Sequence, residues 1–304
     1  MMPVTHNPHM AQTVLSELQA TTLDQPFHVI EPVVRTVPML VASPHSGRNY
    51  PPDFIASSRL AFNALRRSED SFVDELLAGA GSVGIPLLRA DFPRVYCDVN
   101  REPWELDPVM FADKLPPWCN TGSARVLAGF GTIARLVSSG EPIYRTKLTF
   151  AEAEERIRAC WQPYHEILAH RIGDTVAKHG VCLLLDAHSM PSLPEMPRGT
   201  DPDFVLGDAF GTSCAPSITQ FTEQFLRERG FRVRRNDPYA GGYVTRHYGR
   251  PSNQVHVLQV EVCRSLYMNE ARFEKLAHFV QIQDVFSALL AALAELVPTI
   301  QPKP

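Results

Sequence analysis

Several residues that could do chemistry come directly after runs of apolar residues. The segment Val181–Met190 begins with five apolar residues and continues with Asp186 and His188. Such a run is typical of a strand buried on both faces, and strand alternation places residues two apart on one side. Ligands of open α/β sheets bind at the carboxyl ends of such strands. The segment therefore predicts either a functional acid–imidazole pair or a structural histidine held by a neighbouring carboxylate.

Two other apolar runs also end in polar residues. The run at 38–42 is followed by His45 in a Ser-Pro-His-Ser-Gly loop, and the run at 95–99 leads into Asn100 and Arg101. We expect both runs to be strands. The guanidinium of Arg101 is either an ordinary surface charge or a fork suited to bidentate capture of a carboxylate.

Glu261 lies inside a further strand pattern, Val255–Cys263, with Val260 and Val262 beside it. Carboxylates are rarely buried without a partner. A solvated edge strand would explain the residue, but its apolar surroundings favour a functional base.

Together these strand ends indicate metal-assisted hydrolysis. Two imidazoles and a carboxylate are the ligand set of a catalytic zinc site, which leaves the fourth position to water. Glu261 could take the proton of that water as it attacks a carbonyl, and Arg101 could hold a negatively charged substrate. The Gly-x-Ser-x-Gly and Walker A motifs are both absent from the sequence.

The elements that must position these residues alternate along the chain. We expect helices over 54–80, 149–179, 217–229 and 273–296, and further strands over 85–90, 204–206 and 231–234. This order predicts a single three-layer α/β domain over 28–304, around a mixed, mostly parallel sheet, after a leader over 1–27 with one helical piece at 10–20. Residues 102–125 are expected to form a long, functional loop. On the 54–80 helix, Asp70 and Asp74 would share one face.

Composition excludes several classes of protein. The chain has 304 residues, a net charge of −4 and no basic block, which argues against nucleic-acid binding. We see no apolar run near the roughly 18 residues of a membrane span and no signal peptide, and so expect a cytoplasmic protein without membrane partners. The six cysteines include no Cys-x-x-Cys pair, which predicts buried thiols rather than disulfides or a cysteine metal site.

A family resemblance makes this more specific. The chain contains, in order, Ser-Pro-His-Ser-Gly (43–47), Asp-Val-Asn-Arg-Glu-Pro (98–103), Asp-Ala-His-Ser-Met (186–190), Gly-Thr-Ser-Cys-Ala-Pro (211–216), Gly-Gly-Tyr-Val-Thr-Arg-His-Tyr-Gly (241–249) and Gln-Val-Glu-Val-Cys-Arg-Ser-Leu-Tyr-Met (259–268). Over 38–270 it closely resembles the N-formylglutamate amidohydrolase family, which is similar in fold to zinc carboxypeptidases and aspartoacylase. Those enzymes use a His, a Glu three residues later, a distant His, a late Glu as base and an Asn-Arg pair. Here Arg48 stands three residues after His45, so the acidic ligand must come from elsewhere.

The resemblance implies a site and a reaction. His45, Asp70 and His188 would bind a divalent metal, with Zn²⁺ as the expected ion and Asp74 as the second choice for the carboxylate. Glu261 would be the base, and Arg101 or Tyr243 the oxyanion donor. The substrate, a small N-acyl amino acid, would be N-formyl-L-glutamate, cleaved to formate and glutamate. The residues expected to bind its carboxylates are Asn100, Arg101, Arg246 and Arg264, and Asp186 would orient a metal ligand.

Three alternatives remain open at this point. One is a related metal amidase acting on another N-acyl amino acid, or a carboxypeptidase-like cell-wall enzyme. Another is a non-catalytic binding protein with the same fold. The third is a metal-free hydrolase with Ser189 or Cys263 as its nucleophile. The sequence predicts no oligomeric state, and we interpret His247 and His256 as structural.

Overall fold

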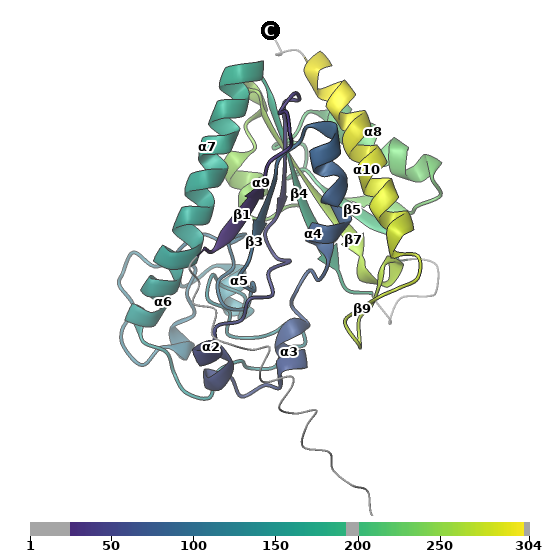
Figure 1. The fold of residues 1–304 in the computed structure, drawn as a ribbon. Coiled ribbons are helices and arrows are strands. Elements are labelled where there is room, and N and C mark those ends of the chain that lie inside the picture. Colours follow the sequence, from purple (N-terminus) through teal and green to yellow (C-terminus); the bar gives the residue numbers. More distant parts are fainter. Residues whose placement is uncertain (1–24, 193–200, 301–304) are drawn as a thin grey trace, which may run out of the picture.

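A mixed sheet forms the centre of the protein in the computed structural model, which describes residues 25–192 and 201–300 (Figure 1). Within this part, seven strands lie in the order β1-β3-β2-β4-β7-β5-β6. Strands β3, β2, β4 and β7 are parallel neighbours, whereas β1 and β5 pair antiparallel with β3 and β7. The predicted mixed, mostly parallel α/β sheet is thus confirmed. Its strands are β1 (Phe27–Ile30), β2 (Met39–Ser43), β3 (Leu87–Ala90), β4 (Cys182–Met190), β5 (Phe204–Gly207), β6 (Val233–Arg235) and β7 (Val255–Cys263).

Helices cover both faces of the sheet, as the expected three layers require. Alternation along β4 directs Leu183 and Leu185 into one core, with α4 (Val73–Leu76), α8 (Pro216–Glu228) and α10 (Phe279–Leu296), and Leu184 into the other, with α7 (Gln162–His179). Figure 1 shows α7 on one side of the strands and α10 with α4 on the other. The long helices are α6 (Phe150–Arg156) continued by a π-helical turn, η3 (Ile157–Trp161), and α7, then α8 and α10.

The helix predicted over 54–80 is wrong as one element. The chain forms α2 (Pro52–Ser57), α3 (Phe62–Arg66), α4 (Val73–Leu76) and the 3₁₀-helix η1 (Ala78–Val83) instead. Ser58 is extended, and Phe72 has a left-handed φ of 66°, so the helix cannot continue through either. Asp70 therefore lies in a turn before α4 and does not share a helix face with Asp74.

Other predicted boundaries also change. The strand expected at 95–99 is a buried turn, in which Tyr96 donates to the carbonyl of Pro93 and Asp98 to that of Thr132. Apolar burial of Val95, Cys97 and Val99 produced the strand-like pattern without a sheet partner. The last helix begins at Phe279, after a small hairpin of β8 (Met268–Asn269) and β9 (Glu274–Lys275). The remaining short elements are η2 (Pro108–Met110), α5 (Ala124–Leu127), α9 (Tyr243–Tyr248), η4 (Pro251–Asn253), η5 (Arg264–Leu266) and η6 (Val297–Thr299).

The amino-terminal expectations are mostly outside the described residues. This holds for the helical piece at 10–20, while Phe27, the last residue of the expected leader, already belongs to β1. The division into leader and domain stays a prediction.

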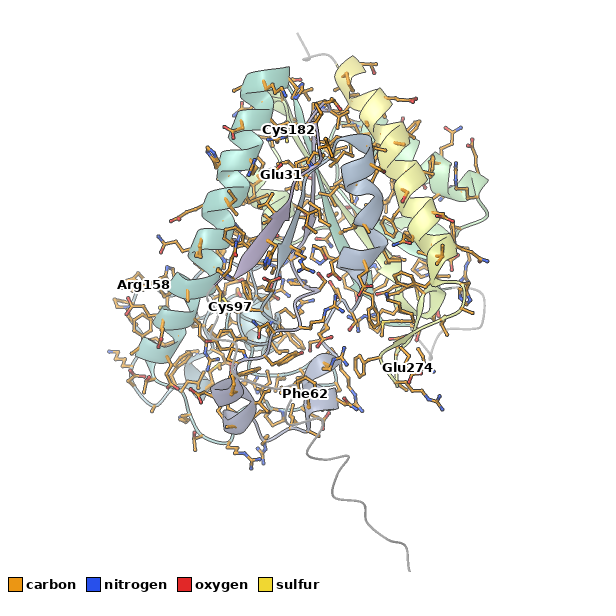
Figure 2. The ribbon with its side chains drawn as sticks, viewed as in Figure 1. Glu31, Phe62, Cys97, Arg158, Cys182 and Glu274 are labelled. Atoms are coloured by element: carbon orange, nitrogen blue, oxygen red, sulfur yellow. The ribbon has the colours of Figure 1, made fainter. Side chains whose placement is uncertain are left out.

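Two predictions about apolar residues have different outcomes. All six cysteines are buried and unpaired, as expected; Cys97 and Cys182 are marked in Figure 2. In contrast, Phe279–Thr299 is long and apolar enough, by length and composition, to span a membrane, which the sequence reading missed. In the structure, one face of α10 is buried against the sheet, through Phe286, Leu289 and Leu293.

Candidate active site

Three buried side chains from distant segments meet at the carboxyl ends of the central strands. The Nδ1 atoms of His45 and His188 lie 3.1 Å apart, and Oδ2 of Asp70 lies 3.1 Å from His188 Nδ1 and 3.4 Å from His45 Nδ1. Each of the three residues is at most 2% exposed. Their donor atoms all lie close enough together to bind one metal ion.

The local fold explains why these residues converge. Strands β2 and β4 are parallel neighbours, so the loop after β2 and the end of β4 deliver His45 and His188 to the same edge. The backbone N–H of Asp70 donates to the carbonyl of His45 at 3.0 Å, which ties the turn before α4 to the histidine loop. At Gly47, a Cβ would lie 2.2 Å from the carbonyl oxygen of Phe92, so the loop needs glycine to approach so closely.

The outer nitrogen of each imidazole faces a second carboxylate. His45 Nε2 lies 2.8 Å from Oδ1 of Asp98, and His188 Nε2 lies 3.0 Å from Oδ2 of Asp186. Nδ2 of Asn100 is also 3.2 Å from His188 Nε2. A carboxylate hydrogen-bonded there fixes the ring orientation and tautomer of a metal-binding histidine. Asp98 makes that bond to His45, whereas Asp186 acts on His188 through its nearby charge.

The donor set fits a cation. If each ring carries its proton on Nε2, beside its carboxylate, both Nδ1 lone pairs and Oδ2 of Asp70 point into the same space. In that tautomer the three acceptors converge without a donor among them and need a positive charge. With the protons on Nδ1 instead, both rings donate to Asp70. Burial alone would raise the pKa of Asp70, but these hydrogen bonds hold it well below its usual value.

The other oxygen of Asp70 is held by the protein. Oδ1 accepts from Nη2 of Arg264 at 3.0 Å and from the hydroxyl of Ser189 at 3.3 Å. Arg264 also donates from Nε to Ser189 and from Nη1 to the carbonyl of Arg67. Each guanidinium nitrogen of Arg264 thus contacts the protein, and its contacts orient Asp70.

Glu261 lies beside this cluster on the next strand. Strand β7 pairs with β4 so that Glu261 is opposite His188, and β7 is an interior strand rather than the solvated edge of the alternative reading. Burial raises the pKa of Glu261 to about 7, while His188 acts to lower it and Asp70 to raise it further. Nε2 of Gln259 donates to Oε1 of Glu261 at 2.9 Å and orients the carboxyl group.

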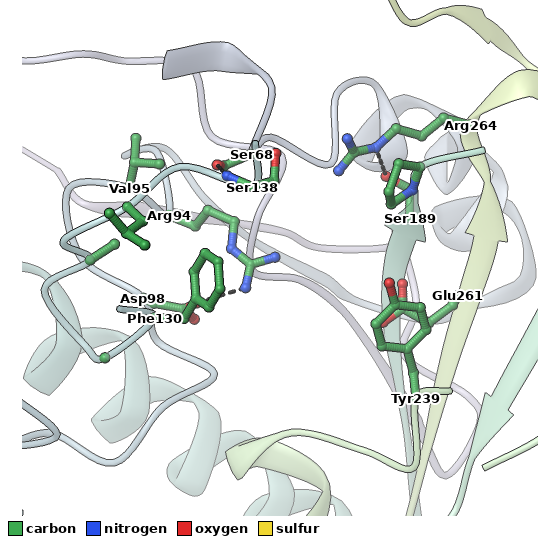
Figure 3. Close-up of a pocket in the computed structure, with 14 residues that line it drawn as sticks. Ser68, Arg94, Val95, Asp98, Phe130, Ser138, Ser189, Tyr239, Glu261 and Arg264 are labelled. Carbon is green, nitrogen blue, oxygen red and sulfur yellow. Dashed lines mark hydrogen bonds and ion pairs between the residues drawn. The ribbon is translucent and has the colours of Figure 1, made fainter. Parts of the chain in front are cut away.

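Two adjoining cavities open beside Glu261. One, of about 220 Å³, reaches His45 and His188; the other, of about 250 Å³, reaches Ser189 and Arg264. Arg94, Tyr239 and Glu261 line both. In Figure 3, the guanidinium of Arg94 extends into the space opposite Glu261 and Tyr239, and is joined to Asp98.

The structure places some of the other predicted residues in the wall of the smaller cavity and leaves others outside both cavities. Asn100 and Arg101 line the smaller cavity. Tyr243 lines a different surface pocket and stacks on His247, and Arg246 donates to the carbonyl of Gly241.

Asp74, the second choice for the metal, forms ion pairs with Arg48 and Arg89 instead. It is not part of the His45–Asp70–His188 cluster.

Sequence reasoning missed Arg94, Arg125 and Tyr239, and gave no role to Asp98. The motif at 98–103 already contained Asp98 immediately before Asn100 and Arg101, so that signal was present. The other three come from irregular segments or a four-residue helix, where no periodicity marks them.

Comparison with known proteins decides the family. The chain matches the family described as N-formylglutamate amidohydrolase over residues 37–268. This chain belongs to the N-formylglutamate amidohydrolase family. A Pseudomonas aeruginosa protein named N-formylglutamate deformylase is 31% identical over 87% of this chain and 92% of its own length. The N-formylglutamate deformylase of Pseudomonas putida is 29% identical over 85% of this chain and 94% of its own length.

One solved structure agrees with this assignment, and a second shares the fold. The crystal structure of N-formylglutamate amidohydrolase from Ralstonia eutropha JMP134 is 37% identical, covers 90% of this chain and 98% of its own, and has a TM-score of 0.84. The gene product Atu2144 from Agrobacterium tumefaciens shares the fold at a TM-score of 0.64 and 15% identity, over 88% of this chain and 96% of its own. As a member of the N-formylglutamate amidohydrolase family, this protein is a hydrolase that acts on amide bonds.

Proposed function

We propose that this family member hydrolyses the formamide bond of N-formyl-L-glutamate to formate and glutamate, and that it needs a divalent metal ion. The observation that carries the proposal is the buried His45–Asp70–His188 cluster next to Glu261, in a chain whose relatives are named N-formylglutamate deformylases. The products and the substrate are small, which suits cavities of about 220 and 250 Å³.

His45, Asp70 and His188 would hold the metal, and Zn²⁺ is the ion we expect from two imidazoles and one carboxylate. When bound, such an ion lowers the pKa of water and polarises a carbonyl oxygen. Asp98, Asp186 and Arg264 would keep the three ligands in place through the contacts described above.

Glu261 is the group we assign to proton transfer. A base works best when its pKa is near the working pH, and burial gives Glu261 a pKa of about 7. It would take a proton from the attacking water and return it to the leaving amine. Gln259 would aim the carboxyl group by its hydrogen bond to Oε1.

Arg94 is a better oxyanion donor than the two residues expected from the sequence. Tyr243 lies outside the cavity, and Arg101 uses Nε and Nη1 on the carbonyls of Phe130 and Asn100. Arg94 faces Glu261 across both cavities while Asp98 fixes one end of its guanidinium at 2.8 Å. A preorganised cation at the developing negative charge stabilises the transition state.

The test is release of formate from N-formyl-L-glutamate by the metal-loaded protein, with N-acetyl-L-glutamate as the competing substrate. We expect formate from the first and far less acetate from the second. Acetate as the main product would favour the alternative of a deacylase with another acyl preference. Full activity after exhaustive chelation, with no ion present, would favour the metal-free hydrolase. Cytoplasmic localisation stays a prediction.

A further inference from the structure

The smaller cavity carries more positive charge than the protein neutralises. Arg94, Arg101 and Arg125 line it, and Glu261 is its acidic residue. Asp98, next to the cavity, pairs with Arg94 at 2.8 Å and with His45 at 2.8 Å, but its nearest approach to Arg101 is 3.9 Å. One carboxylate therefore serves three positive or polar partners. The guanidinium of Arg125 and the Nη2 group of Arg101 are left for a ligand.

Arg125 is the less compensated of the two. It comes from the short helix α5 in the long loop, and within residues 25–192 and 201–300 no hydrogen bond or ion pair holds its guanidinium. Burial, together with the nearby guanidinium of Arg246, lowers the pKa of Arg125, while the charges of Glu105 and Asp98 act to raise it. A partly buried cation without a protein partner is costly unless an anion binds it.

Arg101 and Arg125 are close enough to repel each other. Burial lowers the pKa of Arg101 to about 10, and Arg125 contributes to that lowering. Arg101 follows Asn100, which contacts the metal-ligand candidate His188, so Arg101 is tied to the reacting end of the cavity. Arg125 enters from a separate element, at a second position on the wall.

We propose that Arg125 binds the side-chain carboxylate of a dicarboxylic N-acyl amino acid, while Arg101 binds the α-carboxylate. The inference rests on the proposed function and adds the residue that selects an acidic side chain. Two guanidinium groups on one cavity wall match two carboxylates on one small substrate. The fork of Arg125 can donate two parallel hydrogen bonds, while Arg101, whose Nε and Nη1 bind backbone carbonyls, keeps Nη2 for the α-carboxylate. Arg264, expected from the sequence for this task, is occupied by Asp70.

The experiment compares kcat/KM for N-formyl-L-glutamate and N-formyl-L-glutamine, which differ only in the charge of the side-chain terminus. We expect Arg125→Met to lower kcat/KM for N-formyl-L-glutamate on the order of 100-fold. The same variant should change kcat/KM for N-formyl-L-glutamine less than about 3-fold. Arg101→Met should lower kcat/KM for both substrates alike, because both carry the α-carboxylate. Arg125→Lys keeps the charge and loses the forked donors, so its kcat/KM for N-formyl-L-glutamate should lie between those of the wild type and Arg125→Met.

Arg158→Met is the matched control. Arg158 is exposed, pairs only with Glu154 among the described residues, and lines neither cavity at the site; Figure 2 marks it at the outer side of the helices. We expect wild-type kinetics with both substrates. Competition by L-glutamate and L-glutamine gives a second readout: Arg125→Met should weaken inhibition by glutamate alone.

The outcomes separate the two proposals. The role of Arg125 would be overturned if the wild type releases formate but Arg125→Met keeps the wild-type ratio of kcat/KM for N-formyl-L-glutamate over N-formyl-L-glutamine. The proposed function would then still stand. Equal loss with both substrates, which a merely structural role would give, also overturns the role of Arg125. No formate from either substrate with the wild type would overturn the proposed function and this inference with it.

Discussion

Replacing Asp186 by asparagine separates the metal site from the stability of the fold. Asp186 is fully buried, and Oδ2 lies 3.0 Å from Nε2 of His188. Neither carboxylate oxygen has a well-aligned hydrogen-bond donor in the described structure. The substitution keeps the shape of the side chain and removes the negative charge that polarises His188.

The expected magnitude follows from that geometry. Removing a carboxylate that orients a metal-binding histidine typically weakens metal affinity 10- to 100-fold, which is about 1.4–2.7 kcal/mol. The stability of the metal-free protein should change little, or rise, because a buried charge with a single partner is itself costly. Metal affinity and metal-free stability should thus respond in different ways.

Competition with a chromogenic chelator measures the affinity, and thermal unfolding of the chelator-treated protein measures stability. Asp203→Asn is the matched control, because Asp203 is also largely buried but pairs with Arg232, which lines neither cavity at the site. Its metal affinity should equal that of the wild type. An Asp186→Asn variant that binds metal within about 3-fold of the wild type would refute the reasoning.

Two further predictions concern Glu261. Glu261→Gln should lower kcat by 10²- to 10⁴-fold, the usual contribution of general acid–base catalysis, and leave the metal content unchanged. Steady-state kinetics and elemental analysis measure the two quantities. A variant with near wild-type turnover would rule out Glu261 as the base. A base must be unprotonated to act, so kcat/KM should rise with pH and level off at or below about pH 7, because the buried pKa of about 7 can only be lowered by a bound cation. A pH series on the metal-loaded wild type measures this break, and activity that falls as pH rises from 5 to 7 would contradict the assignment.

Strand patterns made half of the candidate site predictable. His45 and His188 follow apolar runs and Glu261 lies near the end of an alternating strand pattern, and parallel strands bring their carboxyl ends to one edge. The resemblance then requires an acidic ligand, and because Arg48 stands where that ligand would be, Asp70 is our first choice and Asp74 our second. The reasoning from helix periodicity was wrong there, because Asp70 lies in a turn that the left-handed Phe72 closes.

The other residues of the candidate site lie in segments whose sequence shows no helix or strand periodicity. Arg94 and Tyr239 lie in irregular segments and Arg125 on a four-residue helix, so only tertiary packing brings them to the cavity. Arg264 shows the opposite case. Its motif was recognised from the sequence, but its contacts with Asp70 and Ser189 depend on how the loop after β7 packs against the turn before α4.

The most direct measurement is the number of divalent ions per chain in the wild type and in His188→Ala, by elemental analysis of protein purified with metal and freed of excess. We predict one ion per chain in the wild type and close to none in the variant, with formate release lost in parallel. An ion content that does not depend on His188, or full formate release from protein without metal, would contradict the account.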